Sequence, residues 1–140
     1  MKIPTLSQQM LYVKNTYDID QSYFSLPHLF IKMHISPTAF SLKYPITVKY
    51  HYNGRVEAWV TGNLERLDDP DFPHHYGKDL QRGSVKMCLY LPGNNEWDNN
   101  KFIADRIIPW ISDWLYYYEL WVANGEWYGG GEHPEDGESK

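Results

Sequence analysis

The chain has 140 residues, of which 42% are hydrophobic and 16% aromatic, as expected for one folded domain with a core. Its 18 acidic and 13 basic side chains give a net charge of −5 without any basic cluster, which excludes a general affinity for nucleic acid. The single cysteine, Cys88, excludes an intrachain disulfide and a four-cysteine zinc site.

Targeting and membrane segments are not predicted. The first residues lack the apolar run of a signal peptide, and no stretch approaches the roughly 18 apolar residues of a membrane span. We therefore expect a cytoplasmic protein without a membrane partner, and no motif indicates a cofactor. One domain is expected over residues 1–134, with a disordered tail over 135–140.

The N-terminal part predicts a helix followed by a strand. A helix is expected from Leu6 to about Tyr17, with Ser7 as its N-cap. Residues 29–35 predict a strand, because an apolar run there is bounded by Pro27 and Pro37.

The clearest β pattern is a hairpin. Apolar and polar residues alternate over 46–52 and again over 56–61, on either side of Asn53-Gly54. A two-residue loop would place the two apolar sets on opposite faces, so a three-residue loop ending at Gly54 is favoured. This register places Tyr50 opposite Val56, Val48 opposite Ala58, Ile46 opposite Val60 and Lys49 opposite Glu57.

The next segment is expected to be irregular and then to enter a short strand. Residues 62–84 are rich in Gly, Pro, Asn and Asp, which predicts a long loop of the kind that is functional or mobile. Residues 85–91 predict a strand with Val85, Met87, Leu89 and Leu91 on one face. Lys86, Cys88 and Tyr90 would share the other face.

The C-terminal third predicts a long helix. An apolar stripe runs from Asn99 or Asn100, as the cap, to about Asn124. Pro109 predicts a kink or break near Ile108, and Gly125 suits the residue that ends the helix. The aromatic residues on the stripe are expected in the core, whereas Tyr116 and Tyr117 fall partly outside it and could form a partner surface.

Cys88 is the first candidate for chemistry. On the outward face of a strand beside a long loop, its thiol would be accessible, and an accessible thiolate is a nucleophile. The alternative is a buried cysteine that packs as a small apolar side chain.

His74 and His75, in the loop before that strand, could lower the pKa of the thiol or orient a leaving group. Solvated loop histidines are the alternative. A metal site formed by His74, His75, Cys88 and His133 is conceivable, although the spacing matches no standard ligand signature. His28, His34 and His51 are expected to be structural or exposed, and the run Gly129–Gly131 is expected to be a flexible hinge after the helix rather than a phosphate cradle, since it lacks the Lys and Ser/Thr of a P-loop.

Together these segments resemble the ubiquitin-conjugating (UBC-fold) family, and more closely the bacterial UBC-like proteins of CBASS anti-phage systems and related ubiquitin-like operons. Four segments, from Tyr44 to the tail, support the resemblance. They are KYPITVKYHYNGRVEAWVTG, FPHHYG, GSVKMCLYLPGNNEW and PWISDWLYYYELWVANGEWYGGGEHP.

The resemblance implies an α+β, UBC-like fold, in which an N-terminal helix and a long aromatic C-terminal helix flank an antiparallel sheet. It also implies that Cys88 forms a thioester with the C-terminal glycine of a carrier, similar to a cGAS-like nucleotidyltransferase, and passes it to an acceptor amine. A separate activating enzyme or an activated acyl donor would be needed, since the chain has no adenylation domain.

One departure from the family concerns the oxyanion. Eukaryotic members carry a His-Pro-Asn motif before the cysteine, and its Asn stabilises the oxyanion, whereas the matching loop here has no Asn. His74, His75, Asn94 or Asn95 could replace it. Two other functions stay open: a non-catalytic adaptor that binds a nucleotidyltransferase through its aromatic helix, and a small metal-binding or hydrolytic protein.

Overall fold

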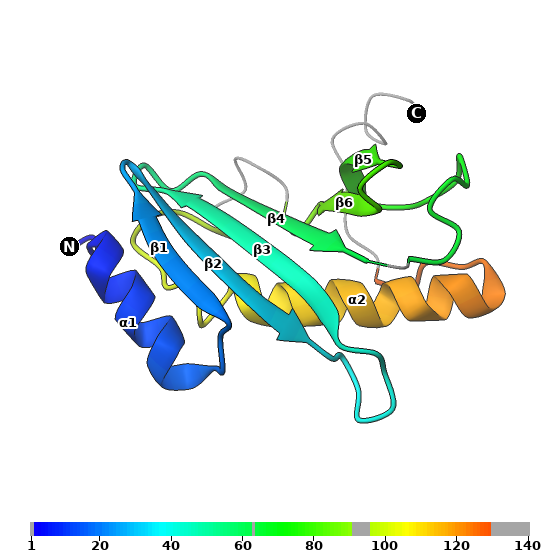
Figure 1. Ribbon diagram of the computed structural model, residues 1–140, viewed down its shortest axis with the longest axis horizontal. Coiled ribbons are helices and arrows are strands. Elements are labelled where there is room, and N and C mark those ends of the chain that lie inside the picture. The colour runs from blue at the N-terminus through cyan, green and yellow to red at the C-terminus, as the bar shows by residue number, and fades with distance from the viewer. Residues whose placement is uncertain (1, 63, 91–95, 130–140) are drawn as a thin grey trace.

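The computed structural model describes residues 2–62, 64–90 and 96–129, and it has the α+β architecture expected from the sequence. One six-stranded antiparallel sheet has the strand order β1-β2-β3-β4-β6-β5. The helix α1 lies at the β1 end, and the long helix α2 crosses one face of the sheet (Figure 1). The elements, in chain order, are α1 Leu6–Thr16, β1 Gln21–Ser25, β2 His28–Ile35, β3 Tyr44–His51, β4 Val56–Thr61, β5 His75–Asp79, β6 Ser84–Met87 and α2 Ile107–Asn124.

The central hairpin forms in the predicted register. Tyr50 pairs with Val56, Val48 with Ala58 and Ile46 with Val60. Gly54 has a φ of 103°, as expected for a glycine in this turn. Every second residue of β3 is buried, so the alternation of the sequence decides which face meets the core.

The core lies between this sheet face and α2. Ile31, Val48 and Val60 of the sheet, and Ile111 and Leu115 of α2, are fully buried. α1 is tied to the same core by Gln9, whose amide donates to Lys101 O at 2.8 Å and accepts from Ile103 N at 2.9 Å.

The N-cap of α1 is Thr5 rather than Ser7, because Thr5 forms a reciprocal capping box with Gln8.

The C-terminal helix begins later than predicted. It starts at Ile107, and turns occupy the residues from Asn99 to Arg106. Pro109 therefore lies in the first helical turn, where its missing N–H leaves no intrahelical bond unmade, so no kink is needed. Gly125 ends the helix with a φ of 82°, as expected.

The region before Cys88 also differs from the prediction. Five residues of the expected loop form β5, and β6 ends at Met87 rather than continuing to Leu91. β5 carries no apolar alternation that would predict a strand, and its pairing with β6 contains a register shift between His75 and Gly77. β1 was not expected either; four of its five residues are exposed. Leu91 lies outside the described residues.

Candidate functional site

Cys88 is the first residue after β6, and it is buried, with 8% of its surface exposed. Alternation along a strand predicts that Cys88 faces outward when Met87 faces inward. This alternation holds only as far as the strand extends. β6 ends at Met87, and Ser84, Val85, Met87 and Cys88 are all buried, so burial does not alternate along this segment. The expectation of an exposed thiol is therefore wrong for this conformation of the protein.

The backbone of Cys88 is held by a main-chain carbonyl. His74 O accepts the Cys88 N–H at 3.1 Å and the indole N–H of Trp114 at 2.8 Å. His74 itself has a φ of 49°, in the left-handed region that few non-glycine residues adopt. One carbonyl thus joins the loop before β5, the residue after β6 and the middle of α2.

The two candidate histidines lie in this region, and their rings meet aromatic side chains. The His74 ring stacks on Trp127, with centroids 4.9 Å apart and planes at 22°. The His75 ring meets Phe72 edge-on at 5.6 Å, and His75 pairs with Met87 in the sheet. The fold therefore brings His74 and His75 next to the Cys88 segment through main-chain contacts.

A pocket of about 170 Å³ opens next to the Cys88 segment, and Cys88 itself is not among its lining residues. The residues on both sides of the cysteine, Met87 and Leu89, line it, and Val56 and Ala58 of β4 form another wall. Polar atoms lie at its rim: Tyr76 Oη donates to Tyr90 O at 3.2 Å, and Lys86 Nζ lies 3.5 Å from a Glu57 carboxylate oxygen. The lining is therefore partly apolar, with polar side chains at the rim.

Tyr76 and Tyr90 are site residues that the sequence did not reveal. Burial raises the pKa of the Tyr90 hydroxyl, which the charge of Cys88 also raises, while a hydrogen bond with the Val56 backbone lowers it. Tyr90 therefore remains a neutral phenol near pH 7. In the sequence, only the alternation that places Tyr90 on the same strand face as Cys88 points to Tyr90.

Several other sequence candidates lie outside the described residues: Asn94, Asn95, His133 and the tail 135–140. Within residues 2–62, 64–90 and 96–129, no three His, Cys, Asp or Glu side chains gather as a metal site would require. The metal site proposed from the sequence thus has no support in that part of the chain.

The remaining candidates lie away from this region. His34 Nδ1 is 2.6 Å from an Asp20 carboxylate oxygen, and the rings of His28 and His51 meet edge-on at 4.9 Å. Tyr116 is 43% exposed on α2 and contacts Tyr117. The exposure of Tyr116 agrees with its predicted place beside the apolar stripe.

Comparisons with known proteins point to one family. A model of the Type II CBASS E2 protein family matches residues 9–134, a range that includes Cys88, His74 and His75. Curated proteins gave no significant match. Neither helix of the described chain combines the length and apolar character of a membrane span.

Proposed function

The chain belongs to the Type II CBASS E2 protein family, which is ubiquitin-conjugating-like, and on this premise we propose that Cys88 is a thioester-forming nucleophile. Its substrate is the activated C-terminal glycine of a carrier protein, for which a cGAS-like nucleotidyltransferase is the first candidate. The observation that carries the proposal is that the chain has one cysteine, which follows β6 and whose two chain neighbours, Met87 and Leu89, line a pocket of about 170 Å³.

The chemistry requires two acyl transfers. In the first, Cys88 Sγ, as the thiolate, attacks the glycine carbonyl carbon; the S–C bond forms and the activating group leaves with the electron pair. In the second, an acceptor amine attacks the same carbon; the N–C bond forms, the C–S bond breaks, and the amine proton is lost as the thiolate leaves. A separate enzyme supplies the activated glycine.

The pocket beside Cys88 is proposed to hold the residues that precede that glycine. Its apolar walls, Val56, Ala58 and Leu89, suit aliphatic side chains, whereas Lys86 and Glu57 can pair with polar groups at the rim. A bulky substitution at Ala58, which is 2% exposed, would narrow this path without touching the thiol.

His74 is proposed to position Cys88 through its carbonyl oxygen. It is also the first candidate to donate a hydrogen bond to the oxyanion, since it lies directly across from Cys88; His75 is the second. Loss of an oxyanion donor lowers acyl-transfer rates by roughly 10²–10³. His74→Ala and His75→Ala should therefore differ in transfer rate, the larger loss identifying the donor.

The decisive experiment uses the purified chain with a candidate cGAS-like nucleotidyltransferase and an activating enzyme. The wild type should form an adduct that dithiothreitol releases, and Cys88→Ala should form none. Cys88→Ser should form at most a thiol-resistant ester. The absence of a thiol-sensitive adduct on the wild type, or equal conjugation by Cys88→Ser, would contradict the proposal.

A second function is favoured by one observation. With Cys88 only 8% exposed, the chain could act as an adaptor that binds the nucleotidyltransferase without catalysis. In that case Cys88→Ala would retain full anti-phage defence. Loss of defence in Cys88→Ala, at unchanged protein level and melting temperature, would exclude the adaptor as the whole function. Either function is proposed to operate in the cytoplasm.

A further inference from the structure

A second pocket lies at the opposite end of β3 from the hairpin turn. The loop of residues 36–43 joins β2 to β3 and projects beyond the sheet (Figure 1). Between this loop and α2 is an open pocket of about 360 Å³. Its lining comprises Thr38, Phe40, Ser41, Leu42, Tyr44, Glu65, Tyr118, Glu119 and Val122. Neither Cys88 nor any wall of the pocket beside it belongs to this set.

The loop is structured, yet it exposes its apolar side chains. Ser36 Oγ lies within hydrogen-bond distance of Thr38 O and Ser41 O, to which it can donate one hydrogen bond, and Phe40 N donates to Thr38 Oγ1. Nevertheless Phe40 is 100% exposed and Leu42 is 69% exposed. Hydrogen bonds therefore hold the loop in place, although the Phe40 side chain at its tip is not buried in the core. An exposed aromatic side chain on an ordered loop is typical of an anchor that a partner buries.

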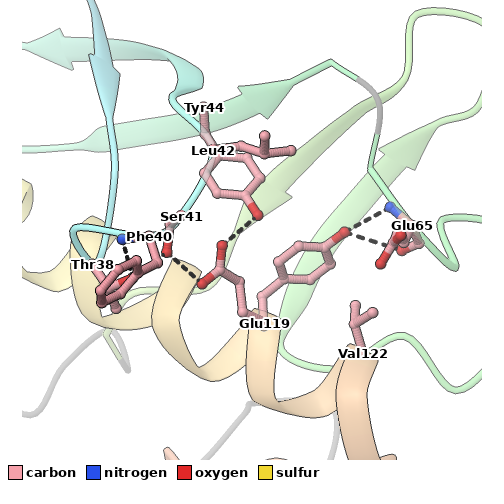
Figure 2. A pocket seen from close by; sticks show the side chains of 9 residues that line it. Thr38, Phe40, Ser41, Leu42, Tyr44, Glu65, Glu119 and Val122 are labelled. Carbon is pink, nitrogen blue, oxygen red and sulfur yellow. Dashed lines mark hydrogen bonds between the residues drawn. The ribbon is translucent and has the colours of Figure 1, made fainter.

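The floor of the pocket is acidic. Glu119, from α2, accepts from Ser41 Oγ and Tyr44 Oη, each at 2.7 Å, and its carboxylate lies between the two hydroxyls (Figure 2). Burial and this carboxylate raise the pKa of Tyr44, so Tyr44 stays a neutral donor. Glu65 adds a second carboxylate to the lining.

No cation neutralises this floor within the described chain. Neither Glu65 nor Glu119 forms an ion pair with a lysine, arginine or histidine there, whereas other carboxylates, such as Glu57 and Asp69, do. Lys43 is nearby in sequence and exposed, but it is not among the lining residues. Two carboxylates beside two exposed apolar side chains complement a cationic side chain that has an apolar neighbour.

We propose that this pocket, defined by Phe40, Leu42, Glu65 and Glu119, docks a protein segment that carries an arginine or lysine next to an aromatic or aliphatic residue. The cation binds the Glu119 and Glu65 carboxylates, and the apolar residue packs on Phe40 and Leu42. The docking site is independent of the proposed thioester chemistry, because none of its residues borders Cys88.

The test is selection from a phage-displayed library of short random peptides on immobilised full-length chain. Enriched peptides should carry Arg or Lys within a turn of an apolar residue. Their affinity should fall about tenfold or more for Phe40→Ser and for Glu119→Gln, since loss of a central anchor typically costs that much. It should also fall with added salt. Cys88→Ala should bind as the wild type does, which separates this result from the proposed function.

Matched variants control for surface polarity and charge. Leu80→Ser removes another exposed leucine, 60% exposed, and Asp113→Asn removes an exposed carboxylate from the same helix. Both should bind the selected peptides normally. Phe40 is fully exposed, so Phe40→Ser should keep the wild-type melting temperature. Lack of enrichment, enrichment of acidic peptides, or equal binding by Phe40→Ser would overturn the proposal.

Discussion

The β3–β4 ladder and the β5–β6 ladder belong to one sheet but are specified in different ways. β3 and β4 pair through five consecutive positions, with burial that alternates along each strand. β5 and β6 pair through four, with a register shift, and four of the five residues of β5 are half-buried. The first ladder is specified by its own pattern, whereas the second depends on contacts from α2.

Those contacts are aromatic and come from far along the chain. Phe72, just before β5, packs against Trp114, Tyr118 and Trp121 of α2. Trp114 also donates to His74 O. The candidate site is thus built on the part of the sheet that local sequence specifies least, so α2 variants should affect the two ladders differently.

The largest expected effect is on the shared core. Leu115 is fully buried on α2, and Leu115→Ala should lower the free energy of unfolding by about 2–5 kcal/mol, because it removes buried methyl groups and leaves a cavity. Urea denaturation followed by circular dichroism measures this. Tyr116→Ala, on the exposed side of α2, should change stability by roughly 0.5 kcal/mol or less. Equal losses in the two variants would contradict the assignment of the buried face.

The second-largest effect is expected at alkaline pH, which should lower the free energy of unfolding. Burial raises the pKa of Tyr50 and of Tyr118 to about 12, above the value near 10 expected when unfolded. Because folding raises the pKa of each tyrosine, its contribution to the free energy of unfolding is fully present below pH 10 and is lost as the pH rises toward 12. We expect a loss of about 2 kcal/mol per tyrosine by pH 12.

Denaturation between pH 8 and pH 11.5 tests this. Tyr118→Phe should reduce the slope of stability against pH, apart from a constant loss due to its missing hydrogen bonds. An unchanged slope would mean that Tyr118 does not contribute to the alkaline loss.

Gly83→Ala should act on the β5–β6 ladder. Gly83 has a φ of 66°, and an added Cβ would lie 2.8 Å from Gly62 O, so the backbone must shift. We expect a loss of about 1–3 kcal/mol, concentrated near β6. Hydrogen exchange should quicken in β5 and β6 more than in β2 and β3; uniform acceleration would argue against a separate local unit.

The smallest effect should appear at the thiol. Trp114→Phe removes the indole donor to His74 O, a hydrogen bond contributing about 1 kcal/mol. If this bond holds the Cys88 segment closed, alkylation of Cys88 by iodoacetamide should quicken about fivefold. Trp121→Phe shrinks a similarly buried tryptophan without that bond and should leave the rate unchanged. Equal rates in the two variants would remove Trp114 from the control of the thiol.

The hairpin register and the β2 strand could be predicted because the apolar residues of the sequence directly indicate them. The end of the C-terminal helix could also be predicted, since a glycine marks it. Its start could not be, because the apolar pattern continues upstream into turns in which Phe102 and Ile103 still pack against the protein.

The site was predicted only in part. Cys88, His74 and His75 are close in the fold, but no local pattern marks the burial of the thiol. β5 lacks alternation, so Tyr76 was not recognised as part of the pocket rim. The role of the His74 carbonyl depends on Trp114 of α2, which lies forty residues further along the chain.

That carbonyl has a mechanical consequence. An amide oxygen has two lone pairs, and both are engaged, one by the Cys88 amide and one by the Trp114 indole. The orientation of the His74 peptide plane is therefore common to α2 and to the cysteine segment. The position of the Cys88 backbone and the position of the Trp114 indole are therefore coupled through one peptide group, which is the coupling that the Trp114→Phe alkylation experiment measures.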